Sequence, residues 1–374
     1  MIAQVLVFCN NKFMNIGIIG NYGATNIGDD AILESILKSH PEHNFTVFSA
    51  NPDKIDKKSN LQVVKPLFPL GIRSFFKNGF RKPIKALKAV DVVIFGGGGL
   101  MQDSYLFACF LWAWQIFWVK FFNKPLFIYA TGVGPLKTRI GRRLAKYVYN
   151  YAMGITCRDK KSKNILLSLK IPSESIEITA DPVFLLQNIK NHTERKHNRY
   201  IISLRPWLKY NKKIISVFTE YLLQIKEERG AEFVFVCMQS IKERDHAVID
   251  PIVKKVGGTM FIPQNFAELT KIMQEAEFAI GMRYHFLIAT ILTQTPALAI
   301  SYSPKVDSLL KDSILEPYML AVSDLSSAKL TDKLKRLSVD YNNVKVYQKR
   351  RCEDFKELAR NNIGYFEGFI KSGN

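Results

Sequence analysis

The chain has 374 residues, of which 47% are hydrophobic and 23% are charged. This balance excludes a disordered chain and suits two folded domains of ordinary size. Lys and Arg number 53 against 33 Asp and Glu, a formal net charge of +20. Such an excess favours an anionic partner: nucleic acid, a membrane surface or a phosphorylated small molecule.

The five cysteines are scattered and form no C-x-x-C pair, which indicates a reducing compartment and buried apolar roles. The amino-terminal stretch has no basic leader and no small-residue cleavage signature, so no secretory signal is predicted and a cytoplasmic location is expected. Histidines and cysteines do not cluster as zinc ligands do, and we therefore predict no metal site.

In the first half, short β-branched strands alternate with longer helical segments, the pattern of βαβ units in a parallel sheet. Strands are predicted over 15–20, 44–49, 91–95, 125–130 and 154–158, with helices over 30–39, 105–122 and 139–149. This half is predicted to form a Rossmann-like domain over 14–187, with residues 1–13 as an extension outside the fold. The polar stretch over 188–198 is predicted to be a linker.

The second half repeats the pattern. Strands are predicted over 199–204, 232–237, 259–262, 278–281 and 297–301, with helices over 214–228, 266–275 and 286–293. We expect a second Rossmann-like domain over 199–325 and helices over 326–374. The predicted fold class is thus α/β, with two Rossmann-like domains facing a cleft and C-terminal helices.

The first strand leads into a glycine-containing turn, GNYGATNIGDD over 20–30. Its spacing is not G-x-G-x-x-G and no acidic residue ends the second strand, so a nicotinamide dinucleotide is not expected. Asp29 and Asp30 stand where a phosphate-binding loop requires Lys and Ser or Thr, which excludes a triphosphate site. Acids in a first helical turn also complement the helix dipole. Asn26 and Asp29 are the better candidates for hydrogen bonds to sugar hydroxyls.

A second turn, Gly96 to Gly99, follows the strand over 91–95 and leads to Gln102 and Asp103. Four successive glycines require a special backbone geometry. A tight structural turn would explain them. We favour close approach of a substrate to Gly97 and Gly98, because ligands bind at the carboxyl ends of parallel strands.

Cationic side chains recur where predicted strands end. Arg283 and His285 follow the strand over 278–281, and Lys305 follows the strand over 297–301. Arg158 and Arg205 also end strands, although each is equally consistent with an ion pair. Several cations converging on one cleft suit a small polyanion, since arginine binds carboxylate or phosphate through two parallel hydrogen bonds.

Several segments in order resemble the polysaccharide pyruvyl transferase family, closest to its bacterial cell-surface-anchoring branch. They are GNYGATNIGDDAIL (20–33), VVIFGGGGLMQD (92–103), YATGVGPL (129–136), RDKKS (158–162), TADPVFLL (179–186), SLRPW (203–207) and GMRYHFLIATILTQTPALAISYSPKV (281–306).

The resemblance implies a glycosyltransferase-B-like fold, phosphoenolpyruvate as donor and co-substrate, and no cofactor or metal. It also implies a sugar acceptor, such as a lipid-linked oligosaccharide. The family's Arg-x-His pair falls on Arg283 and His285 and its motif lysine on Lys305. These residues would hold the donor, with His285 also a candidate acid and Asp29 a weak candidate base.

Residues 105–122 are apolar and aromatic almost throughout, and aromatic and basic residues alternate over 72–82. The uncharged part of 105–122, about 15 residues, would span roughly 22 Å as a helix, too short for a hydrocarbon core of ~30 Å. A helix buried on all sides is one interpretation. The other is a peripheral contact with anionic lipid on the inner face of the plasma membrane.

Two other functions share some of these features. A glycosyltransferase that uses a nucleotide sugar would have the same architecture and a basic cleft. A nucleic-acid or membrane adaptor would explain the charge. No nucleic-acid motif is present, however, and the cations lie at strand ends, so we expect no nucleic-acid partner.

Overall fold

The computed structural model describes residues 13–56, 59–67, 80–103, 106–186, 195–239, 244–311 and 313–372. Its contacts divide the chain into two compact units. Unit 1 comprises residues 1–24, 32–186 and 355–374, and unit 2 comprises residues 25–31 and 187–354. Nearly all of the predicted extension and most of the predicted linker lie outside the described residues.

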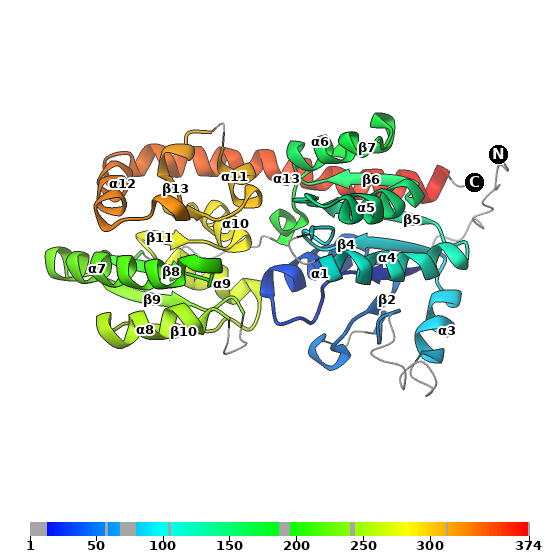
Figure 1. The fold of residues 1–374 in the computed structure, drawn as a ribbon, viewed down its shortest axis with the longest axis horizontal. Coiled ribbons are helices and arrows are strands. Elements are labelled where there is room, and N and C mark those ends of the chain that lie inside the picture. Colours follow the sequence, from blue (N-terminus) through cyan, green and yellow to red (C-terminus); the bar gives the residue numbers. More distant parts are fainter. Residues whose placement is uncertain are drawn as a thin grey trace. The chain divides into compact units, whose positions relative to one another are not determined.

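Unit 1 contains a parallel sheet in the order β3-β2-β1-β4-β5-β6-β7 (Figure 1). Its strands are β1 (Asn15–Ile19), β2 (Asn44–Phe48), β3 (Leu61–Val64), β4 (Val92–Gly96), β5 (Leu126–Thr131), β6 (Gly154–Cys157) and β7 (Ile176–Ile178). Its helices are α1 (Ile27–Ser39), α3 (Arg81–Ala89), α4 (Leu106–Phe121), α5 (Arg139–Tyr151) and α6 (Lys160–Ser168), the first turn of α1 being grouped with unit 2. The strand order reverses between β1 and β4, where such sheets open a crevice for ligands.

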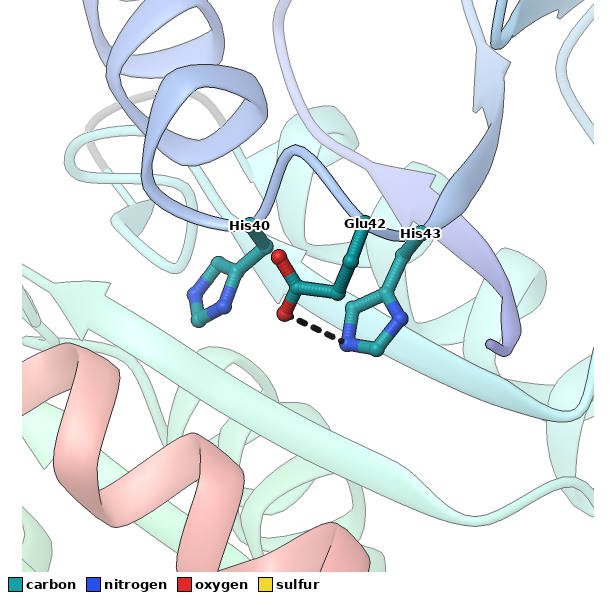
Figure 2. Close-up of side chains that lie close together, drawn as sticks. All are labelled: His40, Glu42 and His43. Atoms are coloured by element: carbon teal, nitrogen blue, oxygen red, sulfur yellow. Dashed lines mark ion pairs between the residues drawn. The ribbon is translucent and has the colours of Figure 1, made fainter. Parts of the chain in front are cut away.

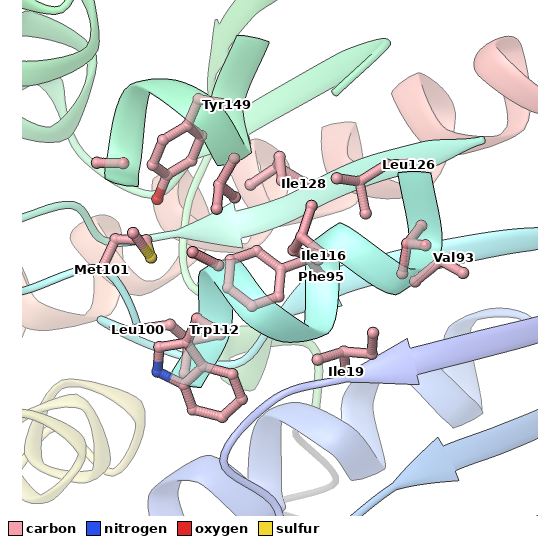
Figure 3. Close-up of a cluster of buried hydrophobic side chains, with 14 of the residues drawn as sticks. Ile19, Val93, Phe95, Leu100, Met101, Trp112, Ile116, Leu126, Ile128 and Tyr149 are labelled. Atoms are coloured by element: carbon pink, nitrogen blue, oxygen red, sulfur yellow. The ribbon is translucent and has the colours of Figure 1, made fainter. Parts of the chain in front are cut away.

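The core of unit 1 follows from the alternation of side chains along the strands. Leu126 and Ile128 of β5 point to the face covered by α4 and α5, where they join a cluster with Phe95, Trp112 and Tyr149 (Figure 3). The intervening Phe127 and Tyr129 contact Phe366 on the opposite face. Because both faces are covered by helices, the strand is apolar throughout rather than alternating.

Unit 2 contains a parallel sheet in the order β10-β9-β8-β11-β12-β13. Its strands are β8 (Arg199–Ser203), β9 (Glu232–Val236), β10 (Thr259–Phe261), β11 (Phe278–Gly281), β12 (Ala297–Ser301) and β13 (Met319–Ala321). Its helices are α7 (Asn211–Arg229), α8 (His246–Val256), α9 (Phe266–Gln274), α10 (Tyr284–Leu292), α11 (Pro304–Leu310) and α12 (Ser327–Val339). The long α13 (Tyr341–Ser372) begins in unit 2 and ends in unit 1.

All ten predicted strands are present, which confirms the two Rossmann-like domains and the C-terminal helices. The sequence patterns did not identify β3, β7, β13, α3, α6 or α8. Strands β7, β10 and β13 have three residues each, and of these only β10 was identified, from the apolar run over 259–262. Helix α8 carries Pro251 in its interior, which ordinarily argues against a helix.

The units differ from the predicted domain boundaries in two places. Residues 25–31 belong with unit 2, and residues from Phe355 onward belong with unit 1. The end of α13 is tied to unit 1 by Asn362, a fully buried residue whose amide binds the Thr179 hydroxyl at 2.7 Å and the Ala180 carbonyl at 3.0 Å. Phe366 of the same helix packs on β5.

Helix α4 has two different faces. Cys109, Trp112, Ile116 and Val119 are buried in the unit 1 core. Five aromatic side chains on the other side are exposed: Phe107, Phe110, Trp114, Phe117 and Phe121. The interpretation of a helix buried on all sides is therefore wrong. No helix in the described part of the chain combines the length and the hydropathy needed to cross a bilayer.

Candidate functional site

The carboxyl edge of the unit 2 sheet collects most of the cationic residues that the sequence singled out. Strands β8, β11 and β12 are parallel neighbours, so their carboxyl ends lie side by side. Arg205 follows β8, Arg283 and His285 follow β11, and Lys305 follows β12. The geometry therefore brings these side chains to one edge of a single sheet. Strands β8 and β11 are neighbours in that sheet although they are about 80 residues apart along the chain.

Arg283 is held in a buried ion pair. Its Nε donates to Asp245 Oδ2 at 3.0 Å, and its Nη2 contacts Asp245 Oδ1 and donates to Gln239 Oε1 at 2.9 Å. Asp245 is fully buried and also accepts the backbone N–H groups of Met238 and Gln239. Within the described residues these bonds leave Nη1 of Arg283 uncommitted. Arg283 thus ties the end of β11 to the segment after β9.

His285 packs directly against the backbone of Gly28 at the start of α1. A Cβ atom at Gly28 would lie 2.0 Å from Nδ1 of His285 and 2.3 Å from its Cγ. The imidazole is 4% exposed and meets the Tyr284 ring edge-on at 5.4 Å between centroids. A glycine is therefore required at position 28 because of the histidine ring, a relation that the glycine spacing did not reveal.

Two cations at this edge are held by aromatic rings. The Arg205 guanidinium lies over the Trp207 and Tyr302 rings, and its Nη1 donates to the Tyr302 hydroxyl at 3.0 Å. Lys305 Nζ lies 4.9 Å from the centroid of the Tyr284 ring. Both cations are partly exposed. Such cation–π contacts attract a positive charge to the face of an aromatic ring.

Asn26 and Asp29 lie in the short segment that belongs with unit 2. Asn26 pairs with Gln239 in an isolated antiparallel bridge, and its amide donates to Asp29 Oδ2 at 2.8 Å. Gln239 therefore contacts both Asn26 and Arg283. The sequence patterns missed Gln239, Asp245 and Tyr302. Trp207 and Tyr302 stand close to Arg205 and Lys305 in the segments SLRPW (203–207) and SYSPK (301–305), so those segments could have indicated them. No motif around Asp245 indicated that residue.

Arg158, by contrast, lies in unit 1 and is enclosed by carboxylates. Its Nη1 is 3.3 Å from Asp181 Oδ2 and its Nε is 3.6 Å from Asp159 Oδ2. A Cβ atom at Gly132 would lie 2.5 Å from Nη2 of Arg158. This geometry supports the ion-pair interpretation of Arg158.

The glycine turn of unit 1 has a structural explanation. Gly97 and Gly98 have φ angles of +98° and +90°, which favour glycine. A Cβ atom at Gly97 would also lie 2.6 Å from the Tyr22 hydroxyl oxygen. These observations support the tight-turn interpretation, with Tyr22 packed against the turn.

Gln102 and Asp103 follow that turn, and both are partly buried. The Asp103 carboxylate accepts the backbone N–H of Thr138, the residue that caps α5. Partial burial raises the pKa of Asp103, but hydrogen bonds from the Lys137 and Thr138 backbones outweigh it and lower the pKa overall. Asp103 thus braces the start of α5 in its charged form.

His40, Glu42 and His43 lie together between α1 and β2, and their side chains point toward one another (Figure 2). His43 Nδ1 accepts the Met14 N–H at 3.3 Å, which places the proton of neutral His43 on Nε2, facing Glu42 Oε1 at 3.3 Å. A metal bound at Nε2 would displace that proton, and the ring would then have to be an imidazolate for Nδ1 to go on accepting the Met14 N–H. The hydrogen bond from Met14 to Nδ1 therefore fits a structural role for His43 better than a metal centre.

Comparison with known proteins gives one family and one fold. A family model described as polysaccharide pyruvyl transferase matches residues 26–304. The amylovoran biosynthesis protein AmsJ of Erwinia amylovora is 23% identical, covering 92% of this chain and 97% of AmsJ.

Among solved structures, Anabaena HepE in complex with UDP and glucose has a TM-score of 0.62 at 9% identity, covering 96% of this chain and 100% of HepE. The UDP-GlcNAc 2-epimerase of Neisseria meningitidis, bound to UDP-GlcNAc, has a TM-score of 0.59 at 13% identity, covering 95% of this chain and 99% of the epimerase. These similarities confirm the glycosyltransferase-B type of fold.

Proposed function

The chain belongs to the polysaccharide pyruvyl transferase family, and on that premise we propose that it transfers the pyruvyl group of phosphoenolpyruvate to a sugar as a ketal. The match confirms the family resemblance seen in the sequence. The name of AmsJ, a protein of amylovoran biosynthesis, supports an acceptor that is part of a cell-surface polysaccharide.

The observation that carries the proposal is the cationic edge of the unit 2 sheet. Phosphoenolpyruvate presents a carboxylate and a phosphate a few bonds apart, and at neutral pH both are charged. Arg205 and Lys305 offer partly exposed cations that lie over aromatic rings. We assign these two residues to the donor's anionic groups. Arg283 adds Nη1 to the same edge, and its pair with Asp245 positions the backbone that carries His285.

The proposed reaction balances without a metal or a further cofactor. Two hydroxyl oxygens of the acceptor bond to the central enol carbon, one hydroxyl proton passes to the methylene carbon, and the C–O bond to phosphate breaks. The second hydroxyl proton leaves to a base or to the departing phosphate. His285 is the proposed acid for the methylene carbon, and fixed cations stabilise the charge on phosphate.

Asn26 and Asp29 are the proposed acceptor-binding residues. They lie in the segment that carries Gly28, against which His285 packs. An amide and a carboxylate can hydrogen-bond a pair of sugar hydroxyls, and Asp29 is the proposed base. For unit 1, it stays a proposal that the backbone of Gly97 and Gly98 and the side chains of Gln102 and Asp103 contact the acceptor. It likewise stays a proposal that Arg158 contacts the donor.

A nucleotide-sugar glycosyltransferase is the competing function, because the structural neighbours named above hold UDP or UDP-GlcNAc. The experiment is thermal unfolding of the full chain with phosphoenolpyruvate or UDP-glucose. A ligand that binds only the native state raises the unfolding temperature by mass action. We expect stabilisation by phosphoenolpyruvate alone, and its loss in Arg205→Gln and Lys305→Gln.

Lys345→Gln is the matched control. Lys345 also lies over a tyrosine ring, 5.4 Å from the centroid of Tyr341. Tyr341 packs against Phe278, the first residue of β11, at the amino edge of the sheet. The control variant should keep the full shift. Stabilisation by UDP-glucose alone would replace the proposal with glycosyl transfer. If Lys345→Gln lost the stabilisation by phosphoenolpyruvate as fully as Arg205→Gln and Lys305→Gln, the cationic edge would not be the donor site.

A further inference from the structure

The exposed side of α4 forms a continuous aromatic stripe. Phe107, Phe110, Trp114, Phe117 and Phe121 follow one another at intervals of three and four residues, which places them on one helix face. Each is between 39% and 67% exposed. A single exposed aromatic is unremarkable, but five in register are an apolar surface of the kind that marks an interaction site.

The stripe is ordered by contacts among its own rings. Trp114 stacks on Phe117 at 5.7 Å, and Phe117 lies 6.1 Å from Phe121. Trp118, half-buried beside them, contacts Trp114, Phe117 and Phe121 at 5.4–6.1 Å. Because the rings are already packed, little side-chain entropy is lost when the stripe binds a surface.

Positive charge borders the stripe. Helix α3 is joined to α4 at both ends, by Phe80 against Trp118 at 5.3 Å and by Lys88 over the Phe122 ring at 5.0 Å. Its exposed residues include four bases: Arg81, Lys82, Lys85 and Lys88. Helix α5, which packs on the other flank of α4, adds Arg139, Arg142, Arg143 and Lys146. Helices α3, α4 and α5 contain no Asp or Glu.

We propose that this surface, the α4 stripe with the bases of α3, docks on an anionic lipid bilayer. Aromatic side chains favour the boundary between acyl chains and headgroups, and bases favour anionic headgroups. A helix of 16 residues is about 24 Å long, and one side of α4 is committed to the protein core. The helix therefore lies along the bilayer surface and does not cross it.

This surface lies in unit 1 alone, whereas the proposed donor-binding residues Arg205 and Lys305 lie in unit 2. It identifies where a polysaccharide precursor carried on a lipid would meet the enzyme, and that link does rest on the proposed function. An acceptor sugar attached to a lipid stays within reach of a membrane, so an enzyme held there gains in encounter rate without any change in its catalytic residues.

Vesicle flotation tests the docking. The wild-type chain should float with vesicles that contain phosphatidylglycerol, float less as salt rises, and stay behind with pure phosphatidylcholine. Lys82→Gln with Lys85→Gln should weaken binding by about 25-fold, at roughly fivefold per base. Phe110→Gln with Phe117→Gln should weaken it by about tenfold or more, since the apolar area no longer enters the bilayer.

Control variants remove bases and apolar side chains outside this surface. Lys329→Gln with Lys335→Gln removes two exposed bases from α12, and Val339→Gln with Val346→Gln removes two exposed apolar residues from unit 2. Both controls should bind as the wild type does. Since all these side chains are exposed, every variant should unfold within a few degrees of the wild type, which thermal unfolding checks.

Fluorescence quenching by brominated acyl chains separates insertion from simple charge attraction. The exposed Trp114 should be quenched on binding, and Trp114→Phe should remove most of that quenching while flotation persists. No binding of the wild type at low salt would overturn the proposal. So would equal binding by the α3 and α4 variants, or a lipid-free dimer that the Phe110→Gln with Phe117→Gln variant converts to monomer without any vesicle binding.

Discussion

The ion pair between Arg283 and Asp245 allows a test of what the arginine contributes. Arg283→Met keeps an apolar stem of similar length but removes the guanidinium that bonds Asp245 and Gln239. The Asp245 carboxylate is fully buried and would keep only the two backbone N–H groups that it already accepts. Removing one partner of a buried pair costs about 3–5 kcal/mol, because the other charge is left uncompensated.

For a unit of this size, each kcal/mol lowers the unfolding temperature by about 2–4 °C, so we expect a fall on the order of 10 °C in the transition of unit 2. Scanning calorimetry measures it, with the transition of unit 1 as an internal control. Asp245→Asn alone should also destabilise. The double variant should be destabilised by about 1–3 kcal/mol less than the sum of the two single variants. Each single change leaves one member of the pair buried without its partner, and the double change does not.

The opposite pattern would refute this reasoning. If Arg283→Met unfolded at the wild-type temperature and lost only the stabilisation by phosphoenolpyruvate, the guanidinium would serve the donor rather than Asp245. The same experiment therefore decides whether Arg283 is a donor-binding residue or a positioning residue for the turn that carries His285.

Three further outcomes follow from the structure. Gly28→Ala should lower kcat by about 100-fold or more, as loss of a placed acid does, because the new Cβ overlaps the His285 ring; unchanged kinetics would show that the ring is free to move. His40→Phe should flatten the pH dependence of stability. Burial lowers the pKa of His40 to about 4, partly opposed by Glu42 and Glu367, so the native state binds fewer protons than the unfolded state. The contribution of His40 to the free energy of unfolding is then fully present above about pH 6.5 and falls by about 3 kcal/mol as the pH drops toward 4. Urea titrations at pH 7.5 and pH 5 measure it, and an equal loss of stability between these two pH values in the wild type and in His40→Phe would contradict this. Asn362→Ala should cost unit 1 about 2–3 kcal/mol by leaving buried partners unsatisfied, and a loss below 0.5 kcal/mol would show that water replaces the amide.

Much of the fold was predictable because its strands are continuous apolar runs bounded by glycines and polar turns. The strand over 278–281 and the helix after it were identified from such a run. The edge strands β3, β7 and β13 were not identified, whereas β10, also an edge strand of three residues, was. So short a run carries little periodic signal in either direction. The burial of α4 on one side only could not be predicted either, because a helix that is apolar all round does not indicate which face meets the core.

The candidate site divides in the same way. The sequence by itself determined that cations follow β8, β11 and β12, because the position of a residue at the end of a strand is a local property. Only the tertiary structure decided that Arg283 meets Asp245, that His285 needs Gly28, and that Arg158 is enclosed by Asp181. Those partners are 38, 257 and 23 residues apart along the chain. Contacts at such separations depend on the order of strands in each sheet, which no local pattern of residue types encodes.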